Sequence, residues 1–556
     1  MDFNHYFTND ELLKVLQEWA DTYPAIADLS VIGHSHEGNS IHLLTVTNFS
    51  KGADQVKPAV WVDGNLHATE IAGTTAVLYF LNSILTGYNK DEQITRLVDS
   101  CAFYAVPRIN PDGAGLSMAD SPQFIRSGTR RYPWEDMPEG LHTSDIDGNG
   151  RILQMRIPDP NGDWKVSAID PRLMEKRTPA EHGGQYFRVL PEGMIEQYDG
   201  YLMNVGETPY RLDFNRNFPF DWHPESEQYG AGPYPASEPE IAAVVRFVSQ
   251  HSNINAALTF HTFSRVLLRP YSTKPDDEFI EEDLIVYKQL GKLGTEITGY
   301  RNASTYHDFT YNKKSVTYGA FDDWMFDAFG AYAFTIELWD LPTEAGVENR
   351  SFTQWFVEHP QEDDRKIFDW LVKNGGEDAI HDWKPFEHPQ LGRIELGGVN
   401  VHYTWRNPPA PFLEAEVSRH TPWILAIADM LPHLSLIVEE VKRLSETTWS
   451  INLVVENTGY FPTYTSQQAR RRKIIRPVRA SLKLPAGGRI LTGKEHMEFG
   501  WLEGRSNKEI TPVFAHSGTD NRGRVSWVVE APAGSRIDII VTSERAGSIT
   551  RSYLLA

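Results

Sequence analysis

Apolar and polar positions follow two different patterns along the chain. From residue 1 to about 385, runs with helical spacing alternate with short runs that are almost wholly apolar and fit strands covered on both faces. From about residue 448, alternating runs separated by Gly, Pro and Asn turns take over. The first pattern predicts an α/β domain with helices on both faces of a mixed sheet, and the second predicts an antiparallel β-sandwich.

These patterns set the expected domain boundaries. We expect an α/β domain at 1–385, a connecting segment at 386–447 and a sandwich of immunoglobulin-like or transthyretin-like type at 448–556. A stretch near 114–210, rich in Pro, Gly, Asp and Arg, is too long for a plain loop. We predict that it is an insertion that forms a binding rim.

Local signals place the elements that matter most. Thr8 and Glu11 form a capping-box pair, and Ser237 and Glu240 form a second one. Helices are predicted at 12–19, 71–85 and 241–248, and strands at 29–31, 41–46, 59–62, 101–106, 256–260, 332–336, 449–455, 478–484, 525–530 and 537–542.

Composition and charge exclude several classes of protein. The chain has 556 residues and a formal net charge of −22, which disfavours non-specific binding to nucleic acid or anionic lipid. A basic stretch at 470–483 fits a solvated loop that leads into an edge strand. The single cysteine, Cys101, excludes an internal disulfide framework. The chain has neither an apolar stretch long enough to span a membrane nor a secretory signal, so we expect a cytoplasmic protein. The oligomeric state does not follow from the sequence.

The sequence contains a metal-ligand motif in more than one place. A catalytic zinc often takes two His and a Glu, so His-x-x-Glu with a distant His is the pattern of interest. It occurs at His34/Glu37, His67/Glu70 and His359/Glu362. Only His67 and Glu70 follow a predicted buried strand and lead into a helix, which is where open α/β sheets bind their ligands.

Two further ionisable residues stand at strand ends. His261 directly follows strand 256–260, and Glu337 follows strand 332–336. Burying an unpaired carboxylate costs several kcal/mol, and a nearby metal or water removes that cost. A hydrogen-bonded core histidine is the alternative for His261. Four ionisable residues at the carboxyl ends of three strands therefore predict a common site.

The segment Asp213–Phe218 adds another candidate. The planar guanidinium of Arg216 matches a carboxylate with two hydrogen bonds, and Asn215 can supply another donor. A turn stabilised by Asn side chains is the alternative.

These residues resemble those of the zinc carboxypeptidases, also called funnelins. The resemblance covers roughly residues 5–375 and rests on ordered motifs: His67-Ala-Thr-Glu70, Asn110-Pro-Asp-Gly113, Asp213-Phe-Asn-Arg-Asn-Phe218, His261 and Phe334-Thr-Ile-Glu337-Leu. It implies a mixed eight-stranded sheet flanked by helices and a zinc ion bound by His67, Glu70 and His261. It further implies that Glu337 is the general base and that Asn215 and Arg216 hold the substrate's terminal carboxylate.

The same resemblance indicates residues around the substrate. The tyrosine that closes over the substrate is similar to Tyr311, with Tyr306 and Tyr318 as alternatives. Asp322 occupies the position that sets side-chain preference, and an acid there resembles members that cut after basic residues. The alternative for Asp322 is a helix cap.

The chain also departs from the family pattern. Thr69 stands where many members have an arginine between the first two ligands. Arg126, Arg130 and Arg131 all qualify as the arginine that polarises the scissile carbonyl, and we favour Arg131.

A second metal is predicted in the insertion. Asp145, Asp147 and Asn149 match the first half of a calcium loop, although its twelfth position is Arg156. Asp159 or Asp163 would have to complete the shell, and a plain Asp/Gly turn is the alternative.

The resemblance thus predicts a zinc metallocarboxypeptidase acting on peptide or protein C-termini. One alternative is a zinc amidase acting on cell-wall peptides or acylated amino acids. Another is a binding protein with an inactive zinc site, which the presence of Glu337 and a full ligand set disfavours.

Overall fold

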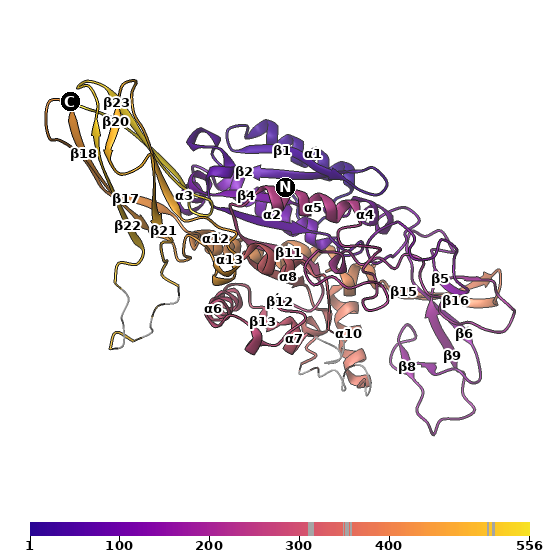
Figure 1. The fold of residues 1–556 in the computed structure, drawn as a ribbon. Coiled ribbons are helices and arrows are strands. Elements are labelled where there is room, and N and C mark those ends of the chain that lie inside the picture. The colour runs from indigo at the N-terminus through magenta and orange to yellow at the C-terminus, as the bar shows by residue number, and fades with distance from the viewer. Residues whose placement is uncertain are drawn as a thin grey trace.

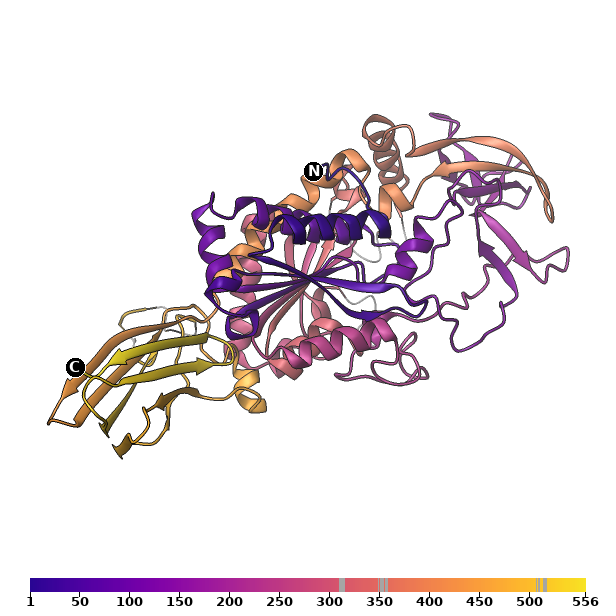
Figure 2. The same ribbon diagram turned by 90° about the horizontal axis from the view of Figure 1, so that it is seen from above.

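The molecule is elongated, with an α/β body between two peripheral β structures (Figure 1). A computed structural model describes residues 1–309, 316–348, 350, 355, 359–506, 508, 511–513 and 518–556. Both views place the C-terminal sandwich at one end of the body and a second sheet, built largely from the insertion, at the opposite end (Figures 1 and 2).

The body is built on one mixed sheet of eight strands. Its centre is parallel, since β3 pairs with both β4 and β11, and β11 pairs with β14. The order across the sheet is β1 (Ala27–His34), β2 (Ser40–Val46), β4 (Ala102–Val106), β3 (Ala59–Gly64), β11 (Ile254–Thr262), β14 (Tyr332–Leu338), β12 (Val266–Arg269) and β13 (Arg301–Ser304).

Helices cover both faces of this sheet, which is why the central strands are buried along nearly their whole length. In β3, Val60 and Val62 join the core under one helical layer, while Trp61 joins the core under the other. The first layer includes α1 (Asn9–Thr22), α2 (Ala72–Gly87), α3 (Glu92–Ser100), α6 (Glu281–Thr298) and α10 (Gln361–Asn374), and the second includes α5 (Pro239–Gln250) and α8 (Phe321–Phe329). The predicted α/β fold class is confirmed.

One predicted capping box forms and the other does not. Thr8 and Glu11 cap α1 reciprocally, as predicted. The Ser237–Glu240 box is wrong: α5 is capped at Glu238, and the Ser237 hydroxyl donates to the Glu238 carboxylate at 2.7 Å. The Glu240 carboxylate instead accepts the backbone N–H of His36 at 2.9 Å. Tertiary partners thus replace the local cap.

The insertion folds into strands that pair with a segment far along the chain. The β16 strand (Gly392–Val399) pairs with β6 (Gln154–Pro158), so the insertion and residues beyond 385 share one six-stranded sheet. Its other strands are β15 (Ile380–His388), β9 (Phe187–Pro191), β7 (Trp164–Val166) and β8 (Met174–Lys176), and β5 (Gly140–Thr143) pairs separately with β10 (Gly193–Glu196). The expected boundary at 385 therefore falls inside a strand.

The segment expected to connect the domains is part of the body. After the single π-helical turn η6 (His402–Arg406), helices α11 (Ala410–Val417) and α12 (Thr421–Asp429) follow. Their side chains Leu413 and Trp423 belong to the main hydrophobic core. The role of connector predicted for 386–447 is therefore wrong for these elements.

The C-terminal region is a two-sheet antiparallel sandwich, as predicted. It begins earlier than the predicted residue 448, because β17 (Leu434–Arg443) pairs along its length with β18 (Thr448–Asn457). Alternate residues of β18 are buried, which gives the period of two seen in the sequence. The other strands are β22 (Arg522–Glu530) and β20 (Arg489–Thr492) in the first sheet, and β21 (His496–Gly500), β19 (Val478–Lys483), β23 (Arg536–Ser543) and β24 (Gly547–Leu554) in the second.

Among the helices that the structure describes, none combines the length and apolar character that a bilayer crossing requires.

Candidate metal centre and substrate cavity

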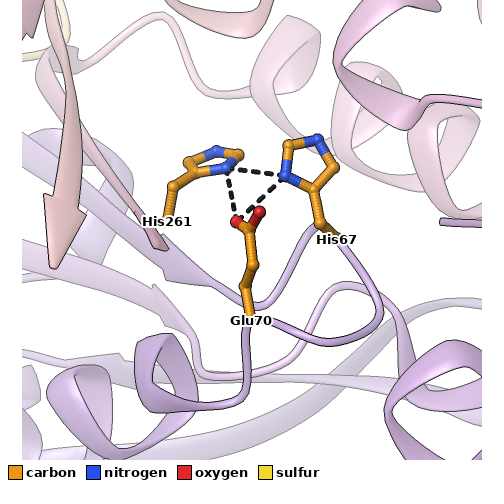
Figure 3. Close-up of side chains that lie close together, drawn as sticks. All are labelled: His67, Glu70 and His261. Carbon is orange, nitrogen blue, oxygen red and sulfur yellow. Dashed lines mark hydrogen bonds and ion pairs between the residues drawn. The ribbon is translucent and has the colours of Figure 1, made fainter. Parts of the chain in front are cut away.

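Three side chains from two parts of the chain meet beside the carboxyl ends of β3 and β11. The Nδ1 atoms of His67 and His261 lie 3.0 Å apart, and Glu70 Oε2 lies 3.0 Å from the first and 3.1 Å from the second (Figure 3). All three residues are buried. The sequence prediction that these residues share a site is therefore matched by their geometry.

Close packing of backbone positions the first two of these side chains. A Cβ on Gly64, the last residue of β3, would lie 2.6 Å from the backbone of Gly73 in the first turn of α2. Only glycine permits this approach, which holds the connecting loop and its residues His67 and Glu70 against the strand ends.

This trio fits a zinc ion. Two imidazole nitrogens and a carboxylate oxygen form a common donor set for catalytic zinc, and such a site keeps a further position open. Burial lowers the pKa of His261, which favours its neutral form. Burial alone would raise the pKa of Glu70, but the imidazoles of His67 and His261 hold it well below its ordinary value. A neutral imidazole and an ionised carboxylate are the protonation states that bind a divalent cation.

A second layer of charges orients these groups. Asp213 Oδ1 lies 3.2 Å from Nε2 of His67, while its Oδ2 accepts a 2.9 Å hydrogen bond from Nε of Arg126. Burial would raise the pKa of Asp213, but the Arg126 guanidinium keeps it well below its usual range. A carboxylate on the far nitrogen of a metal-binding histidine fixes the ring's tautomer and orientation.

Glu337 faces the same cavity. It lies beside His261 in the parallel pairing of β11 and β14. Its Oε2 atom is buried and has no hydrogen-bond partner among the described residues. Desolvation and then the Glu70 carboxylate raise the pKa of Glu337 well above its ordinary value, and the guanidinium groups of Arg126 and Arg406 oppose them. Glu337 is thus a carboxyl group with a free oxygen, close to the metal ligands.

The cavity has a volume of about 480 Å³ and collects the remaining candidates. His67, His261, Glu337, Arg126, Asn215, Arg216 and Asp322 all line it. Asn215 Oδ1 accepts the backbone N–H of Phe321 at 2.8 Å, while its amide nitrogen donates to no described residue. Arg216 donates from Nη1 to the Asn215 carbonyl at 2.6 Å. Arg216 Nη2 also lies 3.9 Å from Asp213 Oδ2, an ion pair without a hydrogen bond, so the amide and the guanidinium can still donate to a ligand.

Asp322 is a buried acid on the wall of this cavity. Desolvation raises its pKa to about 6. Its Oδ1 accepts the N–H of Asp323 at 3.1 Å, and α8 has its N-cap at Ala320, so Asp322 is not the helix cap. A Cβ on Gly319, whose φ is +68°, would lie 2.4 Å from the carbonyl oxygen of Arg216, which shows how tightly this segment packs on the Asp213–Phe218 segment.

Comparison with known proteins decides the family. A family model described as zinc carboxypeptidase matches residues 12–358. The chain belongs to the zinc carboxypeptidase family. A further model, for a domain of unknown function, matches residues 433–553, which includes nearly all of the sandwich.

The relatives in this family are distant. Carboxypeptidase A2 of Rattus norvegicus is 25% identical over 348 residues, which cover 61% of this chain and 64% of the relative. Carboxypeptidase B of Astacus astacus is 26% identical over 347 residues, covering 61% of this chain and 88% of the relative. The solved carboxypeptidase A of Helicoverpa armigera is 16% identical with a TM-score of 0.40, covering 67% of this chain and 74% of that one. The chain thus spans less than two thirds of the length of the rat enzyme.

The three candidate arginines occupy different places. Arg126 lines the zinc carboxypeptidase cavity and donates from Nη1 to Glu70 Oε1 at 3.3 Å. Arg130 instead pairs with Glu238. Arg131, which the sequence favoured, donates to the carbonyl of Glu135 and is not part of the cavity lining. The position of Arg131 outside the cavity lining disagrees with the sequence preference, and the geometry favours Arg126 for this role.

The structure does not select a tyrosine that closes over the substrate. Tyr311 lies outside the described residues. Neither Tyr306 nor Tyr318 lines the cavity, and Tyr318 stacks on His223 with ring centroids 3.8 Å apart.

The aspartates of the predicted calcium loop accept hydrogen bonds from the loop's own backbone. Asp145 Oδ1 accepts the N–H groups of Gly148 and Asn149, and Asp147 Oδ1 also accepts that of Asn149. Glu192, rather than Asn149, completes an acidic group with Asp145 and Asp147. These contacts fit the Asp/Gly turn, and calcium binding gains no support.

Two residues near the metal centre were missed by sequence reasoning. Arg406 Nη1 lies 4.0 Å from Glu70 Oε1. Asn407 donates from Nδ2 to the carbonyl of Thr69 at 2.7 Å, and its Oδ1 accepts the N–H of Ala72 at 3.0 Å. Both lie beyond the family match, and no motif marks them.

Proposed function

We propose that this protein is a zinc-dependent carboxypeptidase that removes the C-terminal residue of peptides, with a preference for Lys or Arg. The observation that carries the proposal is the meeting, in one cavity, of metal ligands, a carboxyl group with a free oxygen and a pair of side chains suited to a carboxylate. Relatives named carboxypeptidase A and carboxypeptidase B are consistent with this activity and leave the side-chain preference open.

The chain's own residues would bind the end of the substrate. Arg216 and the amide of Asn215 donate to the terminal carboxylate, which would place the last peptide bond near His67 and Glu70. Asp322 would accept the cationic end of a Lys or Arg side chain. An ionised Asp322 in this buried setting would favour a cation over an apolar group of similar size.

The reaction would then be a hydrolysis assisted by a general base. Zinc held by His67, Glu70 and His261 would supply Lewis acidity, lowering the pKa of water toward neutrality. Glu337 would take the proton of the attacking water on its free Oε2 and pass it to the leaving amine. Arg126 would stabilise the negative charge that develops on the scissile carbonyl oxygen.

A panel of blocked peptides that differ only at the C-terminus tests this function. One peptide carries a free terminal carboxylate and its twin a terminal amide, each ending in Lys, Leu or Asp. We expect rapid release of the last residue only from the free acids, fastest for Lys, and loss of that release when zinc is removed by a chelator. Equal cleavage of the amides would contradict the proposal and favour the amidase alternative.

A further inference from the structure

A second cavity lies next to the loop that carries His67 and Glu70, since Thr69 of that loop lines it. Its volume is about 290 Å³, or roughly ten waters at liquid density. Much of its wall comes from the insertion, including Ile152, Val189 and Leu190, and Arg406 from the segment after β16 also lines it. The wall is mainly apolar, so this space suits one large apolar side chain.

Contacts around Glu70 link this second cavity to the metal centre. Thr69, its neighbour in sequence, lines the second cavity. Of the two carboxylate oxygens, Oε2 faces the histidines, while Oε1 accepts a hydrogen bond from Arg126 and lies 4.0 Å from Nη1 of Arg406. Arg126 lines the first cavity and Arg406 the second. Each cavity is therefore lined by an arginine that approaches the same carboxylate oxygen of a metal ligand.

The second cavity also presents polar groups with unused hydrogen-bonding capacity. The Arg406 side chain makes no hydrogen bond to any described residue, and its guanidinium carbon lies 5.5 Å from the centre of the Phe263 ring. His402 is buried and stacks on Phe124 with ring centroids 4.7 Å apart, while its Nε2 has no partner in the part of the chain that the structure describes. Buried polar groups are normally hydrogen-bonded, so Nε2 of His402 points to a ligand with a polar group of its own. The Arg406 side chain is 38% exposed and can donate to the same ligand.

An extended peptide has this combination of properties. Each residue carries a backbone carbonyl that can accept from a guanidinium and an N–H that can donate to a neutral imidazole. A substrate whose last residue fills the first cavity must continue away from it past the metal centre. The second cavity, lined by Thr69 and Arg406 beside the metal ligand Glu70, offers a space for the preceding residues.

We propose that the second cavity is a specificity subsite for an apolar side chain upstream of the scissile bond, with Arg406 donating to the backbone carbonyl of that residue. This inference rests on the proposed carboxypeptidase function and adds to it a requirement on the substrate away from its terminus. The subsite depends on tertiary structure, because its wall combines the insertion with residues beyond 400.

Peptides of fixed C-terminus test the subsite in the native zinc protein. Each peptide is N-blocked and ends in Lys, and each of the two preceding positions is varied in turn among Gly, Leu and Asp. At one of these positions, we expect Leu to raise kcat/KM about tenfold or more over Gly, as burial of a whole apolar side chain implies, and Asp to lower it.

Two variants, each with a matched control, test whether the preference for Leu arises in the second cavity. Val189 lies on β9, half-buried, and lines the cavity, so Val189→Asp should bring the Leu-to-Gly ratio close to one. Ile169→Asp makes the same chemical change on an exposed residue of the insertion and should leave the ratio unchanged. Arg406→Gln should lower kcat/KM on the Leu peptide several-fold, whereas Arg393→Gln, an exposed change on β16, should not.

Zinc content and thermal melting establish that each variant is folded. A wild-type Leu-to-Gly ratio near one at both positions, or an undiminished ratio in folded Val189→Asp, overturns the subsite. Cleavage of the Gly peptide in the same series reports the proposed function separately. Failure of the wild type to release Lys from any peptide would remove that function and the subsite with it.

Discussion

Asn407→Ala tests whether the segment after β16 holds the zinc-binding loop in place. Asn407 is fully buried, and its side chain bridges the Thr69 carbonyl and the Ala72 N–H, on either side of Glu70. It also donates to the His402 carbonyl at 3.1 Å. The alanine variant leaves the loop's carbonyl and amide without partners.

The expected cost follows from these two groups. A buried backbone group that loses its partner costs roughly 1–3 kcal/mol. If most of that cost falls on the ordered, zinc-binding form of the loop, it corresponds to about 10–100-fold in zinc affinity. We therefore expect the zinc dissociation constant of Asn407→Ala to rise about 10–100-fold. Competition with a chromophoric chelator measures that constant directly.

A matched control separates this effect from a general loss of stability. Asn457 is equally buried but lies in the sandwich, where its amide donates to the carbonyls of Phe461 at 2.8 Å and Glu503 at 3.0 Å. Asn457→Ala should lower the stability of the sandwich and leave zinc affinity unchanged. If Asn407→Ala bound zinc as tightly as the wild type, the loop would not depend on this bridge and the reasoning would be refuted.

Three further predictions concern the catalytic cavity. Glu337→Gln should lower kcat/KM by about 10²–10⁴-fold while zinc content, measured by metal analysis, stays at the wild-type level; a fully active variant would exclude Glu337 as the base. Because the pKa of Asp322 is raised to about 6, this side chain is neutral below that pH and negative above it. The ratio of kcat/KM for C-terminal Lys over Leu should therefore rise between about pH 5 and about pH 7 in the wild type and stay flat in Asp322→Asn; equal profiles would remove Asp322 from the specificity account. Arg126→Ala should lower kcat/KM about 10²-fold and Arg131→Ala should leave it nearly unchanged, and the reverse order of rates would restore the original choice.

Much of the catalytic region was predictable because its signals are local. The Thr8–Glu11 cap forms as the sequence indicates, since both partners lie within one helical turn. The central strands were recognisable because each is buried on both faces, which gives a largely apolar run. Once those strands were placed, the residues at their carboxyl ends, among them His261 and Glu337, had to approach one another.

The insertion and the segment after it were less predictable. Arg126, Arg130 and Arg131 stand within six residues of one another, and nothing in their spacing separates them. The structure separates them through partners remote in sequence: Asp213 and Glu70 for Arg126, and Glu238 for Arg130. The second capping box failed for the same reason, because the carboxylate of Glu240 found a tertiary partner.

The sequence by itself determined the order of elements in the body, the metal-binding motif and the family. These depend on periodicity and on short spacings, which act through neighbouring residues in the chain. Only the tertiary structure decided which arginine faces the cavity, and that residues around 400 close the site beside Glu70. The pairing of β16 with β6 brings together segments more than two hundred residues apart, and no local pattern carries that information.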